Sequence, residues 1–267
     1  MIIALKSLTY KVNEKKIVRD ISLDIINGDI VSIVGPNGSG KTTLIRMISG
    51  EIKPSVGTVS ILNKAEKDWD LLKLAQHRSV LSQSNQLSFP FSVLDIVKMG
   101  RHPYANHNQE NNAKIAKKVL KAFKLDDYTK RNYTTLSGGE KQRVQIARVI
   151  TQLYSMNQNY NNKILILDEP SSYLDINHQE ELFVFLKKLN KKGLTIIMVL
   201  HDLNQAIQNS NKIIMLKESR LIDYLKSEDL VKSKKIEQVF DIEPTLLYNK
   251  ELKKPILFFK SKEFMNG

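Results

Sequence analysis

The chain has 267 residues, of which 42% are hydrophobic, so it can form one large domain or two small ones around a substantial core. It contains no cysteine, which excludes disulfides and thiolate metal sites and is compatible with a reducing cytoplasm. The formal net charge is +13, but the sequence contains no nucleic-acid-binding motif, so we expect no nucleic acid partner. No apolar run is longer than five residues, so we expect no membrane-spanning segment.

The first third of the chain is predicted to hold strands around one helix. Residues 21–25 alternate apolar and polar side chains, the pattern of a half-buried strand, and residues 29–34 are mostly apolar, as in a buried strand. A helix is predicted over residues 41–49, with Gly50 where a helix C-cap belongs. Two further strands are predicted, over residues 57–62 and 79–82.

From about residue 84 to 153 the pattern is helical, and strands then return in alternation with a helix. This order predicts an α/β fold, a parallel core with a helical insertion. The tail from residue 220 ends in an apolar stretch that fits a hairpin or short strands. The predicted helices cover residues 93–99, 113–123, the stretch after Ser137 and 179–189, and the predicted strands cover 164–167, 195–200 and 212–216.

A glycine-rich loop lies between the predicted strand at 29–34 and the predicted helix at 41–49. Its sequence, GPNGSGKT over residues 35–42, matches G-x-x-x-x-G-K-[ST]. Glycines let successive backbone N–H groups converge on phosphate oxygens, and the helix N-terminus adds partial positive charge. Because Lys41 is placed to reach the β- and γ-phosphates and Thr42 to ligate Mg²⁺, the loop predicts a nucleoside triphosphate site.

Charged side chains follow two later strands of the predicted core. Asp168 ends an apolar strand at the edge where α/β folds bind ligands, and we expect it to hold Mg²⁺ directly or through water. Strand alternation is expected to point Glu169 differently, toward an attacking water that it polarises as general base or orienter. His201 ends the next strand and can hydrogen-bond the γ-phosphate or that water. These residues together predict hydrolysis of the triphosphate.

The stretch LSGGE, residues 136–140, places two adjacent glycines at the start of a predicted helix. Ser137 and Glu140 fit the S-x-x-E capping box, which makes Ser137 the predicted N-cap. Capping does not explain Gly138 and Gly139, because glycine in a helical turn costs stability.

With these motifs in order along nearly its whole length, the sequence resembles the nucleotide-binding subunits of ABC transporters. The resemblance implies one ATP-binding domain over residues 1–267, with a P-loop NTPase core, an antiparallel β subdomain, an inserted helical subdomain at about 84–153 and a C-terminal extension at about 220–267. In that family LSGGE is the signature motif of a head-to-tail homodimer, and each ATP lies between one P-loop and the partner's signature. Bare glycines would let this helix N-terminus approach a γ-phosphate held by the other subunit.

The resemblance also assigns roles to single residues. Gln83 corresponds to the Q-loop glutamine, which contacts Mg²⁺ and the membrane subunit. Tyr10 corresponds to the aromatic residue on which adenine stacks, unless it is an ordinary strand tyrosine. Residues 172–175 correspond to the D-loop, although Tyr173 stands where the family usually has alanine. The implied catalytic residues are Lys41, Gln83, Glu169 and His201, the implied metal ligands are Thr42, Gln83 and Asp168, and the implied nucleotide-binding residues are Tyr10, Gly35, Pro36, Asn37, Gly38, Ser39, Gly40, Lys41, Thr42, Thr43, Ser137, Gly138 and Gly139.

The family implies partners and a location as well. We expect a homodimer of ATPase subunits, peripheral on the cytoplasmic face of the inner membrane, with two transmembrane permease subunits and, indirectly, a periplasmic or surface substrate-binding protein. The start of the chain lacks the basic and long apolar segments of a signal peptide. Residues 93–102 are the expected permease contact, and substitution of Arg101 or Phe91 is expected to weaken assembly.

Short stretches point to the cargo. The run SFPFSV at 88–93, the run DINHQ at 175–179 and the polar insertion at 154–162 are closest to subunits of heme (hemin) importers. An iron-siderophore or cobalamin importer is the alternative. A soluble ABC-type ATPase acting on nucleic acid is a third possibility, which is less favoured because the chain has a single ATPase domain and no long coiled-coil insertion.

Overall fold

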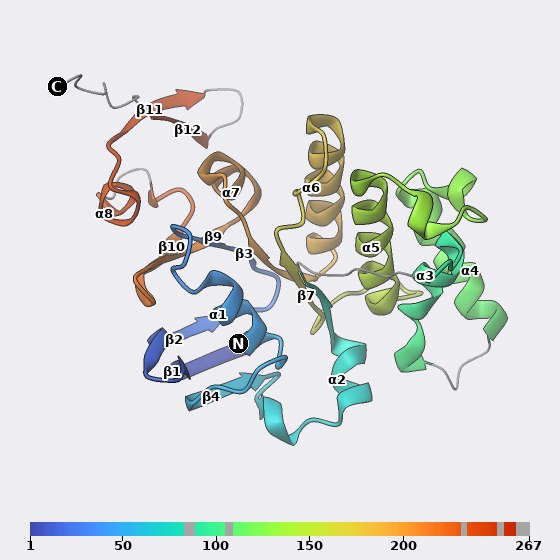
Figure 1. Cartoon of the computed structure of the whole chain (residues 1–267), viewed down its shortest axis with the longest axis horizontal. Helices are drawn as coiled ribbons and strands as arrows, with labels where there is room; N and C mark the ends of the chain where they lie inside the picture. Colours follow the sequence, from blue (N-terminus) through green and yellow to red (C-terminus); the bar gives the residue numbers. More distant parts are fainter. Residues whose placement is uncertain (83–88, 105–108, 231–233, 250–253, 260–267) are drawn as a thin grey trace.

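The structure is a computed structural model, and it describes residues 1–82, 89–104, 109–230, 234–249 and 254–259. The described residues form a central α/β part, an antiparallel β part and a helical part (Figure 1). The antiparallel β part and the helical part lie on different sides of the central sheet.

A six-stranded sheet forms the centre of the molecule. Its strands are β3 (Ile30–Val34), β6 (Arg78–Leu81), β7 (Ile164–Asp168), β8 (Thr195–Val199), β9 (Lys212–Lys217) and β10 (Arg220–Lys226). The order is β10-β9-β3-β8-β7-β6, with β10 antiparallel to β9 and the other pairs parallel. Parallel pairing brings the carboxyl ends of β3, β7 and β8 to one edge, where such sheets bind ligands. The core strands that the sequence predicts are confirmed to within one residue at each end.

The central strands are buried on both faces, and alternate residues serve two separate hydrophobic cores. In β7, Ile164 and Ile166 pack in the core on the side of the antiparallel sheet, whereas Leu165 and Leu167 pack in the core shared with the helical part. Successive strand residues point to opposite faces. The sequence therefore shows continuous apolar runs, as is usual for parallel sheets covered on both sides.

An antiparallel sheet lies below the central one in Figure 1, with one helix between the two. Its strands, in the order β2-β1-β4-β5, are β1 (Ile3–Val12), β2 (Lys15–Ile25), β4 (Val56–Ile61) and β5 (Lys64–Ala65). The helix α1 (Lys41–Ile48) buries Leu44, Ile45, Met47 and Ile48 in the shared core. A short helix, α2 (Leu71–His77), follows this sheet. The sequence did not predict α2, because it buries only Leu74 and shows no apolar stripe.

The helical part consists of α3 (Val93–Met99), α4 (Gln109–Ala122) and α5 (Gly138–Leu153), which pack against one another. In the chain these helices come between β6 and β7, within the residues for which a helical insertion is predicted. The α5 helix also packs against β6 and β7, so it joins the helical part to the central sheet.

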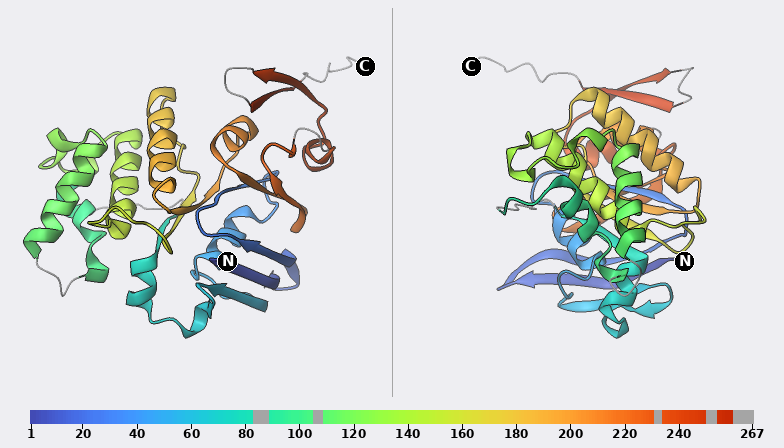
Figure 2. Two further views of the ribbon diagram at one scale, coloured as in Figure 1. Left: turned by 180° about the vertical axis from the view of Figure 1, so that it is seen from behind. Right: turned by 90° about the vertical axis from the view of Figure 1, so that its right-hand side faces the viewer.

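The last part of the chain adds α6 (Ile176–Asn190), α7 (Leu203–Asn209), α8 (Lys235–Phe240) and a hairpin of β11 (Pro244–Asn249) and β12 (Lys254–Phe259). The predicted hairpin is confirmed. It stands over α7, away from the helical part (Figure 2), and Asn204 of α7 exchanges two hydrogen bonds with the backbone of Leu257, at 2.8 and 3.0 Å. The sequence did not predict α7 or α8, which are each shorter than eight residues. Within the described ranges, no helix combines the length and the apolar character that crossing a bilayer requires.

Candidate functional site

The glycine-rich loop lies between the end of β3 and the start of α1, as predicted. Its tip, Asn37 and Gly38, is exposed, whereas Ser39, Gly40 and Lys41 are buried. Gly40 has a φ of 100°, and a Cβ there would lie 2.5 Å from the carbonyl oxygen of Ile17 in β2. At this position glycine is therefore required by the close approach of the chain's own backbone as well as by its conformation.

Lys41 is buried and turns back over the loop. Its Nζ donates hydrogen bonds to the carbonyl oxygens of Gly35, at 2.9 Å, and Pro36, at 3.0 Å. Burial lowers the pKa of Lys41, and the neighbouring charges of Glu169 and Asp168 oppose this effect. The ammonium group thus lies between the loop and the two carboxylates, where it attracts anionic oxygen atoms.

Asp168 ends β7 and is 5% exposed. Burial and then the charge of Glu169 raise the pKa of Asp168 to about 6, and His201 and Lys41 oppose the shift. Its Oδ1 has no hydrogen-bond partner in the part of the chain that the structure describes. A buried carboxylate oxygen without a partner is costly unless a ligand satisfies it.

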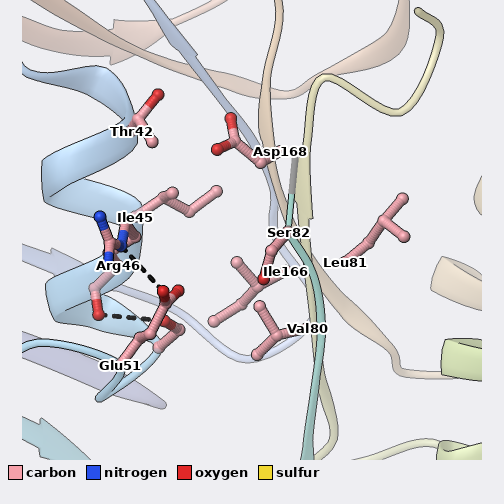
Figure 3. Close-up of a pocket in the computed structure, with 10 residues that line it drawn as sticks. Thr42, Ile45, Arg46, Glu51, Val80, Leu81, Ser82, Ile166 and Asp168 are labelled. Carbon is pink, nitrogen blue, oxygen red and sulfur yellow. Dashed lines mark hydrogen bonds and ion pairs between the residues drawn. The ribbon is translucent and has the colours of Figure 1, made fainter. Parts of the chain in front are cut away.

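A cavity of about 220 Å³ connects Asp168 to α1. Figure 3 shows Thr42 of α1 and Asp168 facing each other at one end of this cavity, while the ion pair of Arg46 and Glu51, at 2.9 Å, lies at the other end. A hydroxyl and a carboxylate that share a cavity are oxygen donors of the kind that a hard divalent cation takes. Two of the three residues predicted to ligate a metal, Thr42 and Asp168, are thus brought together.

Glu169 and His201 meet beside these residues. His201 Nε2 donates a hydrogen bond to Glu169 Oε1 at 2.5 Å, and the Glu169 side chain is 16% exposed. The φ of Glu169 is 51°, so its backbone leaves the strand conformation directly after Asp168, and the alternation expected for a continuing strand does not apply to it. A non-glycine residue in this region is uncommon and is found at functional sites.

The structure does not test the roles predicted for Gln83 and Tyr10. Gln83 lies outside the described residues. Tyr10 is half-buried in β1 and pairs with Val18 of β2, whose side chain would lie 3.3 Å from a Cβ at Gly40. This places Tyr10 one strand away from the glycine-rich loop, and its role in stacking adenine stays a prediction.

The start of α5 has the predicted cap. Ser137 Oγ accepts a hydrogen bond from the backbone N–H of Glu140, at 3.3 Å, and Glu140 Oε2 accepts one from the backbone N–H of Ser137, at 2.7 Å. The second bond is the main cause that lowers the pKa of Glu140. In Figure 1, α5 and α1 lie on opposite sides of β7. The helix that Ser137 caps is therefore separated in space from the helix that follows the glycine-rich loop.

The glycine pair also has a reason within the chain that the sequence did not reveal. A Cβ at Gly139 would lie 2.8 Å from the carbonyl oxygen of Tyr173, and one at Gly138 would lie 3.8 Å from the Tyr173 side chain. Tyr173 has a φ of 67° and is 80% exposed. Gly139 therefore lets α5 start directly against the loop that follows Glu169.

The prediction that Arg101 contacts a membrane subunit is wrong, because Arg101 is 6% exposed. Its Nε donates to Asn112 Oδ1 at 3.1 Å, its Nη1 donates to the carbonyl oxygen of Thr151 at 3.0 Å, and its guanidinium lies over the ring of Tyr104. It holds α4 and α5 together. Phe91, in contrast, is 39% exposed and remains available as a contact.

Comparisons with known proteins show which family the chain resembles over most of its length. A family model described as ABC transporter matches residues 18–172. The hemin import ATP-binding protein HmuV of Escherichia coli O157:H7 is 34% identical over 96% of this chain and 98% of its own length. The protein of the same name from Rhodopseudomonas palustris is 40% identical over 85% of this chain and 83% of its own length.

Solved structures of similar fold include the dimeric ATP-binding cassette MJ0796 bound to ADP and phosphate. It has a TM-score of 0.72 and 30% identity and covers 84% of this chain and 98% of its own. A nucleotide-free ATP-binding cassette from an ABC transporter has a TM-score of 0.75 over 90% of this chain and 98% of its own, at 22% identity.

Proposed function

This chain belongs to the ABC transporter family, and on that premise we propose that it is the ATP-hydrolysing subunit of an importer that carries hemin across the cytoplasmic membrane. The observation that carries the proposal is the match to hemin import ATP-binding proteins over most of the chain. The charges that ATP hydrolysis requires are supplied by four side chains that lie close together in the structure: Lys41, Asp168, Glu169 and His201.

The loop at 35–43 and the N-terminus of α1 bind the triphosphate of ATP. Backbone N–H groups and the positive end of the helix attract phosphate oxygens. Lys41 replaces its two carbonyl contacts with contacts to the β- and γ-phosphates, and the ion pair is strong because the ammonium is buried. Tyr10 stacks on adenine, one strand away from the loop.

The oxygen donors of Thr42 and Asp168 fit Mg²⁺, which proteins hold through one or two carboxylates together with substrate phosphates. The unpartnered buried Oδ1 of Asp168 supports this assignment. Gln83 is a further proposed ligand. When bound, Mg²⁺ neutralises the charge that develops on the phosphates during transfer.

Glu169 directs the water that attacks the γ-phosphate. Its Oε1 is held by His201, while its Oε2 accepts a long hydrogen bond, 3.4 Å, from Ser172 Oγ and is the oxygen that we assign to the water. The water oxygen bonds to phosphorus, the bond to the β–γ bridging oxygen breaks, and ADP and phosphate result. Glu169 takes the proton as general base or orients the water while the proton passes to phosphate.

A second copy of the chain is proposed to complete each site. Ser137, Gly138 and Gly139 begin α5, which lies on the other side of β7 from the chain's own α1 in Figure 1, and helix N-termini bind anions. The dimeric cassette among the similar structures supports this assembly. We further propose two permease subunits as partners, a binding protein that delivers cargo to them, and a position on the cytoplasmic face of the membrane.

The test is reconstitution of the chain with its permease in vesicles. Hemin, delivered by its binding protein, should raise ATP turnover and accumulate in the vesicle, whereas a ferric siderophore and cobalamin should not. Lys41→Ala should abolish uptake by weakening nucleotide binding. Transport of a siderophore or cobalamin in place of hemin would contradict the assigned cargo and leave the ATPase assignment intact.

A further inference from the structure

Three contacts join the start of α5 to the segment that runs from Glu169 into α6. Gly139 lies against the carbonyl oxygen of Tyr173, and Gln142 Nε2 donates to the carbonyl oxygen of Pro170 at 3.2 Å. The third contact links Arg143 to His178 in the first turn of α6. Of the three, only this last one is made between two side chains, so a substitution can remove it without touching the backbone.

The contact between Arg143 and His178 determines the tautomer of the imidazole. Arg143 Nη1 lies 3.0 Å from His178 Nε2, and a guanidinium nitrogen can only donate. His178 Nε2 must therefore accept, and the ring proton must lie on Nδ1. That proton is donated to Asp175 Oδ2, at 2.8 Å. The neutral imidazole thus connects Arg143 of α5 to Asp175, the N-cap of α6 and the last residue of the D-loop.

Arg143 is itself held by the end of the α4 segment. Its Nη2 donates to the carbonyl oxygens of Phe123 and Lys124, the latter at 3.3 Å. The side chains of Lys124 and Glu181 form an ion pair beside it. A cavity of about 30 Å³ adjoins Arg143 and His178, and the His178 side chain is 35% exposed. The guanidinium is therefore fixed in position. Its bond to His178 reaches α6, and its charge also acts on Glu181 of that helix.

We propose that His178 is a positioning residue for ATP hydrolysis, which ties the loop carrying Glu169 and Ser172 to the signature helix α5 through its bond to Arg143. The inference rests on the proposed function, since it assumes that α5 contacts the nucleotide of a second copy. Within one chain, Glu169 serves one ATP and Ser137 serves the other. The bridge through His178 fixes these two groups relative to each other, so it acts on turnover and not on the binding of nucleotide to the glycine-rich loop.

Two amide substitutions separate the two hydrogen bonds of His178. In His178→Gln the longer side chain places an amide oxygen near the position of Nε2, where it can accept from Arg143. In His178→Asn the shorter amide can still donate to Asp175 but leaves Arg143 without an acceptor. We expect His178→Gln to keep most of the kcat of the full chain. His178→Asn and His178→Ala should lose about tenfold in kcat, with KM for ATP changed less than about twofold.

A double-mutant cycle and a matched control complete the experiment. Arg143→Ala combined with His178→Ala should be about as slow as the slower single variant, because both remove one interaction. Lys188→Ala removes an exposed side chain further along α6 and should behave as the unmodified chain. Binding of a fluorescent ATP analogue and the melting temperature are measured for every variant.

The inference would be overturned by full activity of His178→Asn, by additive effects in the cycle, or by losses of kcat that follow losses of nucleotide affinity or of melting temperature. If the unmodified chain hydrolyses no ATP at concentrations where it dimerises, the proposed function itself fails. An active unmodified chain with unaffected variants refutes the role of His178 alone.

Discussion

Replacing Asp168 by asparagine should stabilise the protein when nucleotide and divalent cations are absent. The pKa of Asp168 is raised from 3.8 to about 6, chiefly by burial. At about 1.4 kcal/mol per pKa unit, the ionised carboxylate costs the folded state about 3 kcal/mol at pH 7. Asparagine removes this cost, which is already net of the attraction to Lys41 and His201, but its amide needs hydrogen-bond partners of its own. We therefore expect a gain of about 1–2 kcal/mol, or about 2–6 °C in melting temperature.

The pH dependence of this gain has a defined sign. A carboxyl group whose pKa is raised on folding binds its proton more tightly in the folded state. The destabilisation is therefore absent below the unfolded pKa near 3.8, grows as the pH rises, and is complete above about 6. The advantage of Asp168→Asn over the unmodified chain should be largest at pH 7.5 and should shrink toward pH 4.5.

The assay is urea or thermal unfolding in the presence of a chelator, at several values between pH 4.5 and 8. Asp127→Asn, an exposed aspartate in the helical part, is the matched control and should change stability by less than about 0.5 kcal/mol. Equal or lower stability of Asp168→Asn at pH 7.5, or an advantage that does not depend on pH, would refute the reasoning. Hydrolysis of Mg·ATP by this variant should be lost in either case.

The remaining predictions concern three other positions. Glu169→Gln should keep ATP affinity and lower turnover by about 10²- to 10⁴-fold, and it should trap an ATP-bound dimer visible by size-exclusion chromatography. Normal turnover of this variant would exclude Glu169 from the chemistry. Gly139→Ala should cost about 1–3 kcal/mol in urea unfolding, because its Cβ would lie 2.8 Å from the carbonyl oxygen of Tyr173, whereas Gly138→Ala should be neutral or slightly stabilising. Equal effects of the two alanines would show that Tyr173 is not the reason for Gly139. Arg101→Ala should cost about 2–4 kcal/mol, because it removes a buried guanidinium and leaves Asn112 Oδ1 and the Thr151 carbonyl without its hydrogen bonds. Unchanged stability together with weakened assembly would restore its predicted role at the surface.

The errors in the sequence predictions share a physical cause. Arg101 follows a predicted helix and looks like a surface cation in the sequence. It is buried because Asn112 of α4 and Thr151 of α5, both outside its local stretch of sequence, surround it together with the nearby Tyr104. The helices α2, α7 and α8 were missed because each is only six or seven residues long, which is less than two turns and leaves little room for a helical period to show.

What could be predicted from the sequence is local. The glycine-rich loop, the apolar strands ending in Asp168 and His201, and the capping box of Ser137 and Glu140 depend on residues within a few positions of one another, so their geometry follows from backbone conformation and short hydrogen bonds. These features sufficed to indicate an ATPase of the ABC transporter family.

Only the tertiary structure decided how these local features act on one another. The raised pKa of Asp168 requires its burial at the end of β7 next to the charge of Glu169, and the bond between His201 and Glu169 requires two neighbouring strands to end side by side. The tautomer of His178 requires Arg143 from another helix. Electrostatic and hydrogen-bond energies depend on distance and burial in space, which the order of residues along a chain does not contain.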